Sequence, residues 1–218
     1  MMQNGTNMTD ERGRVAFHTI PDGTPDNVFP GLDAVNFYTD FANPTKEVYT
    51  WNNDFADSFE AFANGETAFF FGYSYHVPLF RTASPKLNFA TSKLPQISGG
   101  REVNYANYWV NSVSKDTENV DWAWDFVAFM ADADNVTPYL DETKKPPALR
   151  SLINGTLADE DVGTFAEQLL TAKSWYHGND VAAMEQAMND FIDAVLAGPE
   201  DIESTIEQAA RVVAQTYE

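Results

Sequence analysis

The sequence predicts an α/β layered fold that is followed by a helical C-terminal part. Residues 67–71 form a short, continuous apolar run between glycines, which is typical of a strand buried on both faces of a parallel or mixed sheet. Segments with apolar residues at helical spacing surround this run and two other strand-like runs. Residues 146–218 contain only amphipathic helical segments. Strands mixed with helices first, and helices alone afterwards, indicate a layered domain with a helical appendage.

Each expected element follows from a local pattern. Helices are expected where apolar residues recur every three or four positions and capping residues stand at the ends. They cover about residues 32–42, 54–64, 76–81, 118–131, 134–140, 148–153, 161–173, 180–197 and 201–215. Strands are expected where short runs are apolar, aromatic or β-branched. They cover about residues 67–71, 87–93 and 105–113.

The centre of the predicted fold is the strand at residues 67–71. Gly65 ends the helix before it, because glycine takes the left-handed conformation after a helix at little cost. Gly72 allows a sharp turn after the strand, and Tyr73 and Tyr75 follow at once. Ligands of open α/β sheets bind at strand ends, so we expect these two tyrosines to lie near a binding site.

The helix expected at residues 118–131 is apolar on nearly all sides. One stripe consists of Val120, Ala123, Trp124, Val127 and Met130, and a second consists of Trp122, Phe126 and Phe129. A helix of this kind is usually buried, so we expect this one to lie between layers of the domain.

Composition and charge exclude several classes of protein. The 218 residues include 33 acidic and 13 basic ones, which gives a net charge of −20 and disfavours binding to nucleic acid or to anionic membrane surfaces. Cysteine is absent, so there are no disulfides and no thiolate chemistry. No apolar run approaches the ~20 residues that span a bilayer, so we expect no membrane insertion. The first 13 residues do not have the pattern of a signal peptide.

Aromatic residues on expected loops and strand ends are the main candidates for a binding site. They are Trp51, Tyr73, Tyr75, Tyr108, Trp109, Trp175 and Tyr176. Sugars present apolar C–H faces and a rim of hydroxyl groups, so a sugar site needs flat rings together with polar partners. Asn107 and Asn111 flank one aromatic pair and could supply such partners. The alternative is that these rings fill the core, as aromatic side chains often do.

Other side chains give weaker signals. Arg150 follows a rigid Pro-Pro sequence and could bind hydroxyl or carboxylate oxygens, or it could pair with one of many surface acids. The three histidines lack metal-ligand spacing, and no nucleophile or nucleotide-binding motif is present, so we expect no catalytic residue, metal or cofactor. A pair of Asp or Glu side chains could serve a carbohydrate-active hydrolase, which remains the alternative function.

An ordered set of motifs resembles a known family. A short helix, Asn-Gly, a Thr-Ala-apolar run, Gly and an aromatic residue occur in that order over residues 62–75. Further motifs follow at Leu94-Pro95 and at residues 107–115, 123–130 and 146–150. This order is similar to that of the extracellular solute-binding proteins of ABC importers, in the carbohydrate-binding group (family 1) that includes maltose-binding protein.

The resemblance implies a periplasmic-binding-protein-like type II lobe with a mixed sheet flanked by helices. The implied domains are a polar tail or lead-in segment at residues 1–28, an α/β lobe at residues 29–145 and a helical part at residues 146–218 that completes the lobe or inter-lobe region. Chains of this family are about twice as long, so an N-terminal lobe carrying the export signal is expected to be missing.

The resemblance also implies a function. The protein would bind a sugar or oligosaccharide outside the cytoplasm, in the periplasm or anchored to the cell surface as a lipoprotein, and would deliver it to the permease subunits of an ABC importer. Arg150 would lie near the cleft between the lobes.

Overall fold

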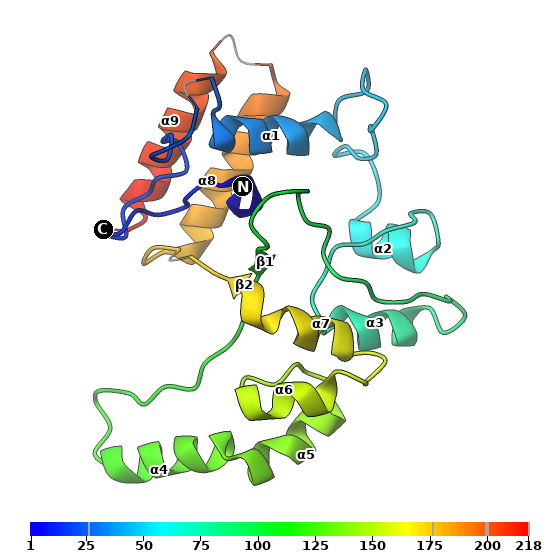
Figure 1. The fold of residues 1–218 in the computed structure, drawn as a ribbon, viewed down its shortest axis with the longest axis vertical. Coiled ribbons are helices and arrows are strands. Elements are labelled where there is room, and N and C mark those ends of the chain that lie inside the picture. Colours follow the sequence, from blue (N-terminus) through cyan, green and yellow to red (C-terminus); the bar gives the residue numbers. More distant parts are fainter. Residues whose placement is uncertain (26, 176, 199–200, 218) are drawn as a thin grey trace. The chain divides into compact units, whose positions relative to one another are not determined.

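The computed structural model describes residues 1–25, 27–175, 177–198 and 201–217 of the chain (Figure 1). The chain divides into two compact units, each built from separate stretches of sequence. The first unit comprises Met1–Phe55, Gln96–Val103 and Lys173–Glu218, and the second comprises Ala56–Pro95 and Asn104–Ala172. This division differs from the expected domains, whose boundaries lie after residues 28 and 145, because segments far apart in the sequence pack together.

The first unit is built mainly from helices. They are the short 3-10 helix η1 (Met2–Asn4), α1 (Pro30–Asp40), α8 (Val181–Leu196) and α9 (Ile202–Gln215). Helices α8 and α9 lie side by side, and α1 packs against both of them (Figure 1). Asp180 and Asp201 cap α8 and α9 by accepting backbone N–H groups, which confirms the expected starts of both helices.

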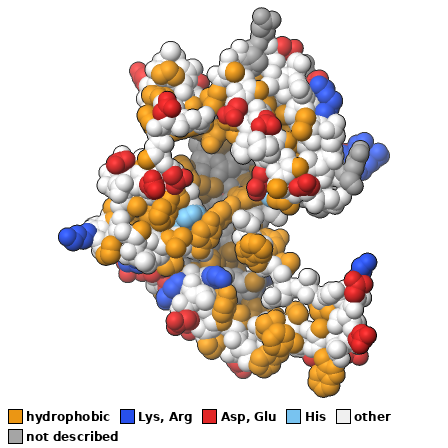
Figure 2. All heavy atoms as spheres, turned by 180° about the vertical axis from the view of Figure 1, so that it is seen from behind, with side chains coloured by type: hydrophobic (Ala, Val, Ile, Leu, Met, Phe, Trp, Pro, Cys, Tyr) orange, Lys and Arg blue, Asp and Glu red, His pale blue; other side chains and the backbone are white. Residues whose placement is uncertain are grey.

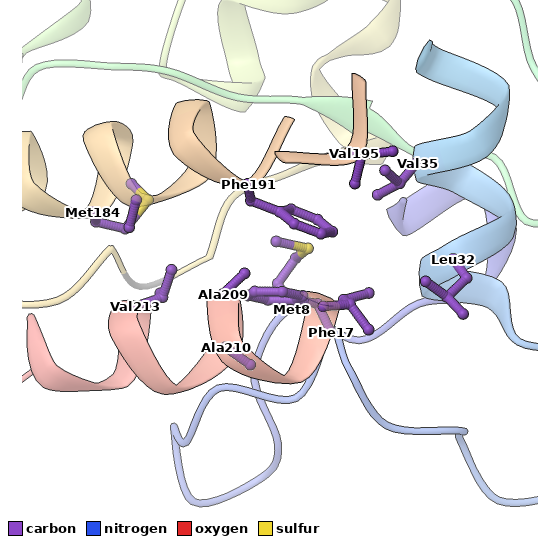
Figure 3. Close-up of a cluster of buried hydrophobic side chains, with 12 residues drawn as sticks. Met8, Phe17, Leu32, Val35, Met184, Phe191, Val195, Ala209, Ala210 and Val213 are labelled. Carbon is purple, nitrogen blue, oxygen red and sulfur yellow. The ribbon is translucent and has the colours of Figure 1, made fainter. Parts of the chain in front are cut away.

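The core of the first unit lies between these three helices and the N-terminal segment (Figure 3). The buried cluster consists of Met8, Phe17, Leu32, Val35, Met184, Ala187, Phe191, Val195, Ile206, Ala209, Ala210 and Val213. Met8 and Phe17 belong to the segment that the sequence predicted to be a polar tail. That prediction is wrong for these residues: two large apolar side chains at positions 8 and 17 are enough to fix the segment against the helices, although its average composition is polar.

The second unit contains the remaining elements. They are α2 (Ser58–Ala63), α3 (His76–Ala83), β1 (Asn104–Tyr105), α4 (Val120–Ala131), α5 (Ala133–Thr143), α6 (Arg150–Thr156), α7 (Gly163–Gln168) and the 3-10 helix η2 (Leu169–Thr171). The last strand, β2 (Ala172–Lys173), begins in this unit, and its second residue belongs to the first unit. Asp57 caps α2 by accepting the Phe59 N–H group at 2.9 Å, and Gly65 follows this helix with φ +75°.

Aromatic rings hold α2 and α3 together in the second unit. The ring of Phe80 on α3 stacks on Phe59 at 4.4 Å and meets Phe62 edge-on at 4.8 Å. Phe70 and Phe89 also contact Phe80, at 5.0 and 5.9 Å between ring centroids. Each such pair adds roughly 0.5–1.5 kcal/mol beyond burial of its area, so this cluster fixes the segments on both sides of α3.

The three expected strands do not form as predicted. The described residues form one sheet, in which two-residue strands β1 and β2 pair, so only the start of the strand expected at residues 105–113 is present. Residues 67–71 and 87–93 form no strand, and Phe69 is 86% exposed. A strand interior to a sheet needs partners on both edges, and no other described segment supplies them here.

Helix α4 forms where it was expected but is not buried between layers. It packs against α5, none of its residues is buried, and Trp122 is 77% exposed. Figure 2 shows hydrophobic side chains on the surface of the lower part of the view, where Figure 1 places α4 and α5. The sequence pattern correctly predicts an apolar helix, but burial requires neighbouring elements that do not pack against α4 in the described residues.

We expect the exposed aromatic face of α4 to contribute little to the stability of the chain. Replacement of Trp122 by Gln should change the free energy of unfolding by no more than about 0.5 kcal/mol, as surface substitutions usually do. Replacement of the buried Phe80 by Ala, as a control, should cost about 3–5 kcal/mol. Urea unfolding followed by circular dichroism measures both. A loss of several kcal/mol at Trp122 would contradict the arrangement of α4.

Among the described residues, no helix is both long enough and apolar enough to cross a bilayer.

Candidate ligand-binding site

Tyr73 and Tyr75 lie on the turn that leads into α3, not at the end of a strand as the sequence predicted. Their rings stack, with centroids 5.8 Å apart and planes 24° apart. Tyr73 is half-buried and Tyr75 is exposed. Two neighbouring rings, one of them open to solvent, form a surface on which the apolar face of a ligand can stack.

His76, the first residue of α3, supports both rings. Its imidazole lies 4.1 Å from the ring of Tyr75 and 6.3 Å from the ring of Tyr73, nearly parallel to the latter at 16°. Its Nδ1 lies 3.0 Å from the backbone nitrogen of Tyr73. We refer to Tyr73, Tyr75 and His76 together as the tyrosine platform.

Gly72 makes this close arrangement possible. A Cβ atom at this position would lie 2.4 Å from Cε1 of Phe70 and 2.8 Å from Nδ1 of His76. Both distances are shorter than van der Waals contact, so any larger residue would displace one of the two rings. Glycine at position 72 therefore serves the packing of the histidine rather than the exit from a strand.

A second segment joins the platform through Asn107. The side chain of Asn107 forms a hydrogen bond with that of Tyr73, which opposes the rise in the pKa of Tyr73 that burial causes. Tyr108 and Trp109 follow in the sequence, and the Trp109 side chain is fully exposed (100%). The structure thus brings Asn107 next to the tyrosine platform within one unit, so that aromatic rings and an amide group are available to a ligand.

Arg150 is the first residue of α6 and is exposed. It belongs to the same unit as the platform. Within the described part of the chain, the structure places no side chain of the platform against Arg150. Its proposed part in binding therefore stays a prediction.

The other predicted aromatic residues lie in the first unit. Trp51 packs against Tyr38 of α1, with ring centroids 5.7 Å apart. Trp175 packs against the buried core and lies 4.6 Å from the ring of His177, so for this residue a contribution to the core is observed. Tyr176 lies outside the described residues. Trp51 and Trp175 therefore belong to a different unit from the tyrosine platform.

Two surface hollows are lined by residues other than those of the platform. One of about 480 Å³ is lined by Ala63, Asn64, Ser84, Pro85, Lys86 and Leu87. Another of about 420 Å³ is lined by Asn179, Asp180, Ala183, Val212, Gln215 and Thr216. Neither contains Arg150 or one of the aromatic residues that the sequence marked for binding. In the described ranges, no three His, Asp or Glu side chains are grouped so that they could hold a metal ion.

His76 is the residue of the platform that the sequence analysis did not predict, because the three histidines lack metal-ligand spacing. A signal was present in the sequence. His76 stands one residue after Tyr75 and three after Tyr73, at the start of a helix, and a glycine precedes the group. That spacing places its ring over both tyrosines once the turn forms.

The fold is that of a periplasmic-binding-protein-like lobe, and the chain belongs to the family of bacterial extracellular solute-binding proteins, whose sequence pattern matches residues 1–167. It is similar to an ABC transporter solute-binding protein from Thermotoga lettingae TMO that was crystallised with α-D-tagatose. The two share 18% identity and a TM-score of 0.68, over 100% of this chain and 54% of that one.

It is also similar to the cyclic α-maltosyl-1,6-maltose binding protein of Arthrobacter globiformis. Here the identity is 19% and the TM-score is 0.63, over 99% of this chain and 53% of the other. The chain therefore spans about half the length of these solved structures. No curated protein matches it significantly.

Proposed function

We propose that this chain forms part of the substrate-binding component of an ABC importer and binds a sugar or an oligosaccharide at the tyrosine platform. The observation that carries the proposal is the stacked pair of Tyr73 and Tyr75, held by His76 and by Asn107, in a chain of the solute-binding family. Stacked rings beside an amide match the apolar faces and hydroxyl groups of a sugar.

The mechanism is binding followed by delivery. Two lobes close on the solute because the solute contacts both, and so has a higher affinity for the closed state than for the open one. The closed form would then be presented to the permease subunits of the importer, outside the cytoplasm. Trp51, Tyr108, Trp109, Arg150, Trp175 and Tyr176 remain proposed ligand contacts. The alternative of a hydrolase with an Asp/Glu pair is not retained, because the family is one of binding proteins.

The platform supplies only part of a binding site. The chain spans 54% of the length of the tagatose-binding structure, and contacts from the rest of such a fold would be added to those of Tyr73, Tyr75 and Asn107. Losing half of the contacts while keeping the entropy cost of association leaves weak binding. A millimolar dissociation constant, about −4 kcal/mol, is therefore the tightest binding that we expect of this chain alone.

The test is a titration of the isolated chain with D-tagatose and with maltotriose, followed by ¹H–¹⁵N NMR. We expect millimolar binding of at least one of these sugars, and changes in the amide chemical shifts of residues around Tyr73 and Asn107. Replacement of Tyr75 by Ala should weaken that binding about fivefold, because one stacking ring contributes roughly 1 kcal/mol.

Tyr139 provides a matched control, since it lies in the same unit and is exposed to the same extent as Tyr75, 51%. Replacement of Tyr139 by Ala should leave binding unchanged. Equal affinities of the Tyr75 and Tyr139 variants would contradict the platform, and micromolar binding would show that the site is complete within these residues. The absence of binding to either sugar would contradict the proposed function.

A further inference from the structure

We propose that His76 is a positioning residue that holds the tyrosine platform in its binding conformation only while its imidazole is neutral, so that protonation of His76 lowers the affinity for the sugar. The inference rests on the proposed function for its ligand. The positioning itself can be measured without any ligand.

The contacts of Nδ1 of His76 require the neutral form. The backbone nitrogen of Tyr73 lies 3.0 Å away and its N–H group points at Nδ1, so Nδ1 must accept with a free lone pair. The proton of the neutral ring is therefore on Nε2. This hydrogen bond fixes the backbone of Tyr73 directly and, through the turn, the position of its ring.

Protonation would place a hydrogen on Nδ1 that faces the Tyr73 N–H group, and two donors cannot pair. The nearest acceptor for the new N–H group is the backbone oxygen of Tyr73, 3.3 Å away. That oxygen already accepts the backbone N–H group of His76 at 3.0 Å and has a second lone pair. The protonated Nδ1 can donate to it only if the imidazole turns from the Tyr73 N–H group toward the oxygen. The Tyr73 N–H group then loses its acceptor, and the rings of Tyr73 and Tyr75 lose the imidazole in its present position.

Three phenylalanine rings lie near the imidazole of His76. Phe59 of α2 lies 6.5 Å away, Phe70 5.0 Å away and Phe80 of α3 6.3 Å away. The titratable groups against it are the phenols of Tyr73 and Tyr75. In the described residues no charged side chain contributes to the pKa of His76. No neighbouring carboxylate therefore compensates the imidazolium charge.

The lowered pKa of His76 agrees with this geometry. Burial lowers the pKa of His76 below the usual value of about 6.5, and the contact of Nδ1 with the Tyr73 backbone oxygen, which favours the charged form, opposes this to a smaller extent. The neutral form is thus favoured in the folded chain. Neutral His76 should hold Tyr73 and Tyr75 in place fully above about pH 6.5. This effect should be lost as the pH falls through the lowered pKa of His76.

The first experiment needs no sugar. The imidazole of His76 is titrated by NMR between about pH 8 and pH 5, and the protection factor of the Tyr73 amide is measured over the same range. We expect the protection of Tyr73 to fall with the protonation of His76. In the variant His76→Asn the amide oxygen can accept in place of Nδ1 without titrating, so protection should persist at every pH. In His76→Phe, protection should be absent throughout.

The second experiment repeats the sugar titrations with maltotriose and D-tagatose at both ends of this pH range. We expect the wild-type affinity to fall about fivefold on acidification, which corresponds to the loss of one hydrogen bond. His76→Asn should keep its affinity, and His18→Asn, which changes a histidine of the other unit, should behave as the wild type does. Circular dichroism checks that each variant is folded.

The outcomes separate the two proposals. If the protection of Tyr73 follows the protonation of His76 while neither sugar binds at any pH, the positioning stands and the proposed function fails. If Tyr73 stays protected when His76 is protonated, the inference is overturned. It is equally overturned if the sugar affinity of His76→Asn falls with pH as the wild-type affinity does.

Discussion

Replacement of Phe17 by Ala is expected to lower the free energy of unfolding by about 3–5 kcal/mol. Phe17 has no exposed surface and is among the largest fully buried side chains. Its ring lies 6.4 Å from that of Phe191 on α8, within the cluster that α1, α8 and α9 enclose (Figure 3). The N-terminal segment carries Phe17, so shortening this side chain to Ala removes both packing and the anchor of that segment.

Urea unfolding followed by circular dichroism measures this loss. Phe37 on α1 is the matched control, because it is the same residue type in the same unit but is 69% exposed. Its replacement by Ala should cost less than about 1 kcal/mol. Equal effects at positions 17 and 37 would show that the N-terminal segment does not belong to the core.

Replacement of Gly31 by Ala should also destabilise the chain, by about 1–3 kcal/mol or more, although alanine favours a helix. Gly31 lies in the first turn of α1, where the helix approaches the N-terminal segment. A Cβ atom there would lie 2.2 Å from the backbone oxygen of Phe17 and 3.2 Å from Cδ1 of Ile206. The backbone oxygen cannot rotate away, so α1 must shift from its position over the core.

Gly155, inside α6, provides the opposite case. A Cβ atom at this position would meet nothing within 4 Å. Gly155→Ala should therefore stabilise the chain by about 0.5–1 kcal/mol, the gain in helix propensity alone. The same unfolding measurement applies to both variants. Stabilisation by Gly31→Ala would contradict the close contact between α1 and Phe17.

The helices were predictable because their signals are local. Asp180 and Asp201 mark the starts of α8 and α9, and Asn64-Gly65 marks the end of α2. A cap forms from residues within one turn of each other, so it depends little on distant parts of the chain. The family was predictable for a related reason, since the order of motifs from residue 62 to residue 150 is a property of the sequence.

The strands were not predictable in the same way. An apolar run such as residues 67–71 indicates a strand only if partners are available, and partners come from elsewhere in the sequence. The same applies to α4, whose apolar pattern predicts a helix but does not supply the elements that would cover it. Phe69 and Trp122 are exposed for this reason.

The sequence by itself determined the helical segments, the family and the pair of tyrosines beside Gly72. Only the tertiary structure decided that Phe17 is core, that Asn107 bonds Tyr73, and that His76 supports both rings. Residues 73 and 107 are far apart in sequence, and position 17 lies in a polar segment. Their roles depend on which segments pack together, and that is set by burial summed over many distant side chains rather than by any local pattern.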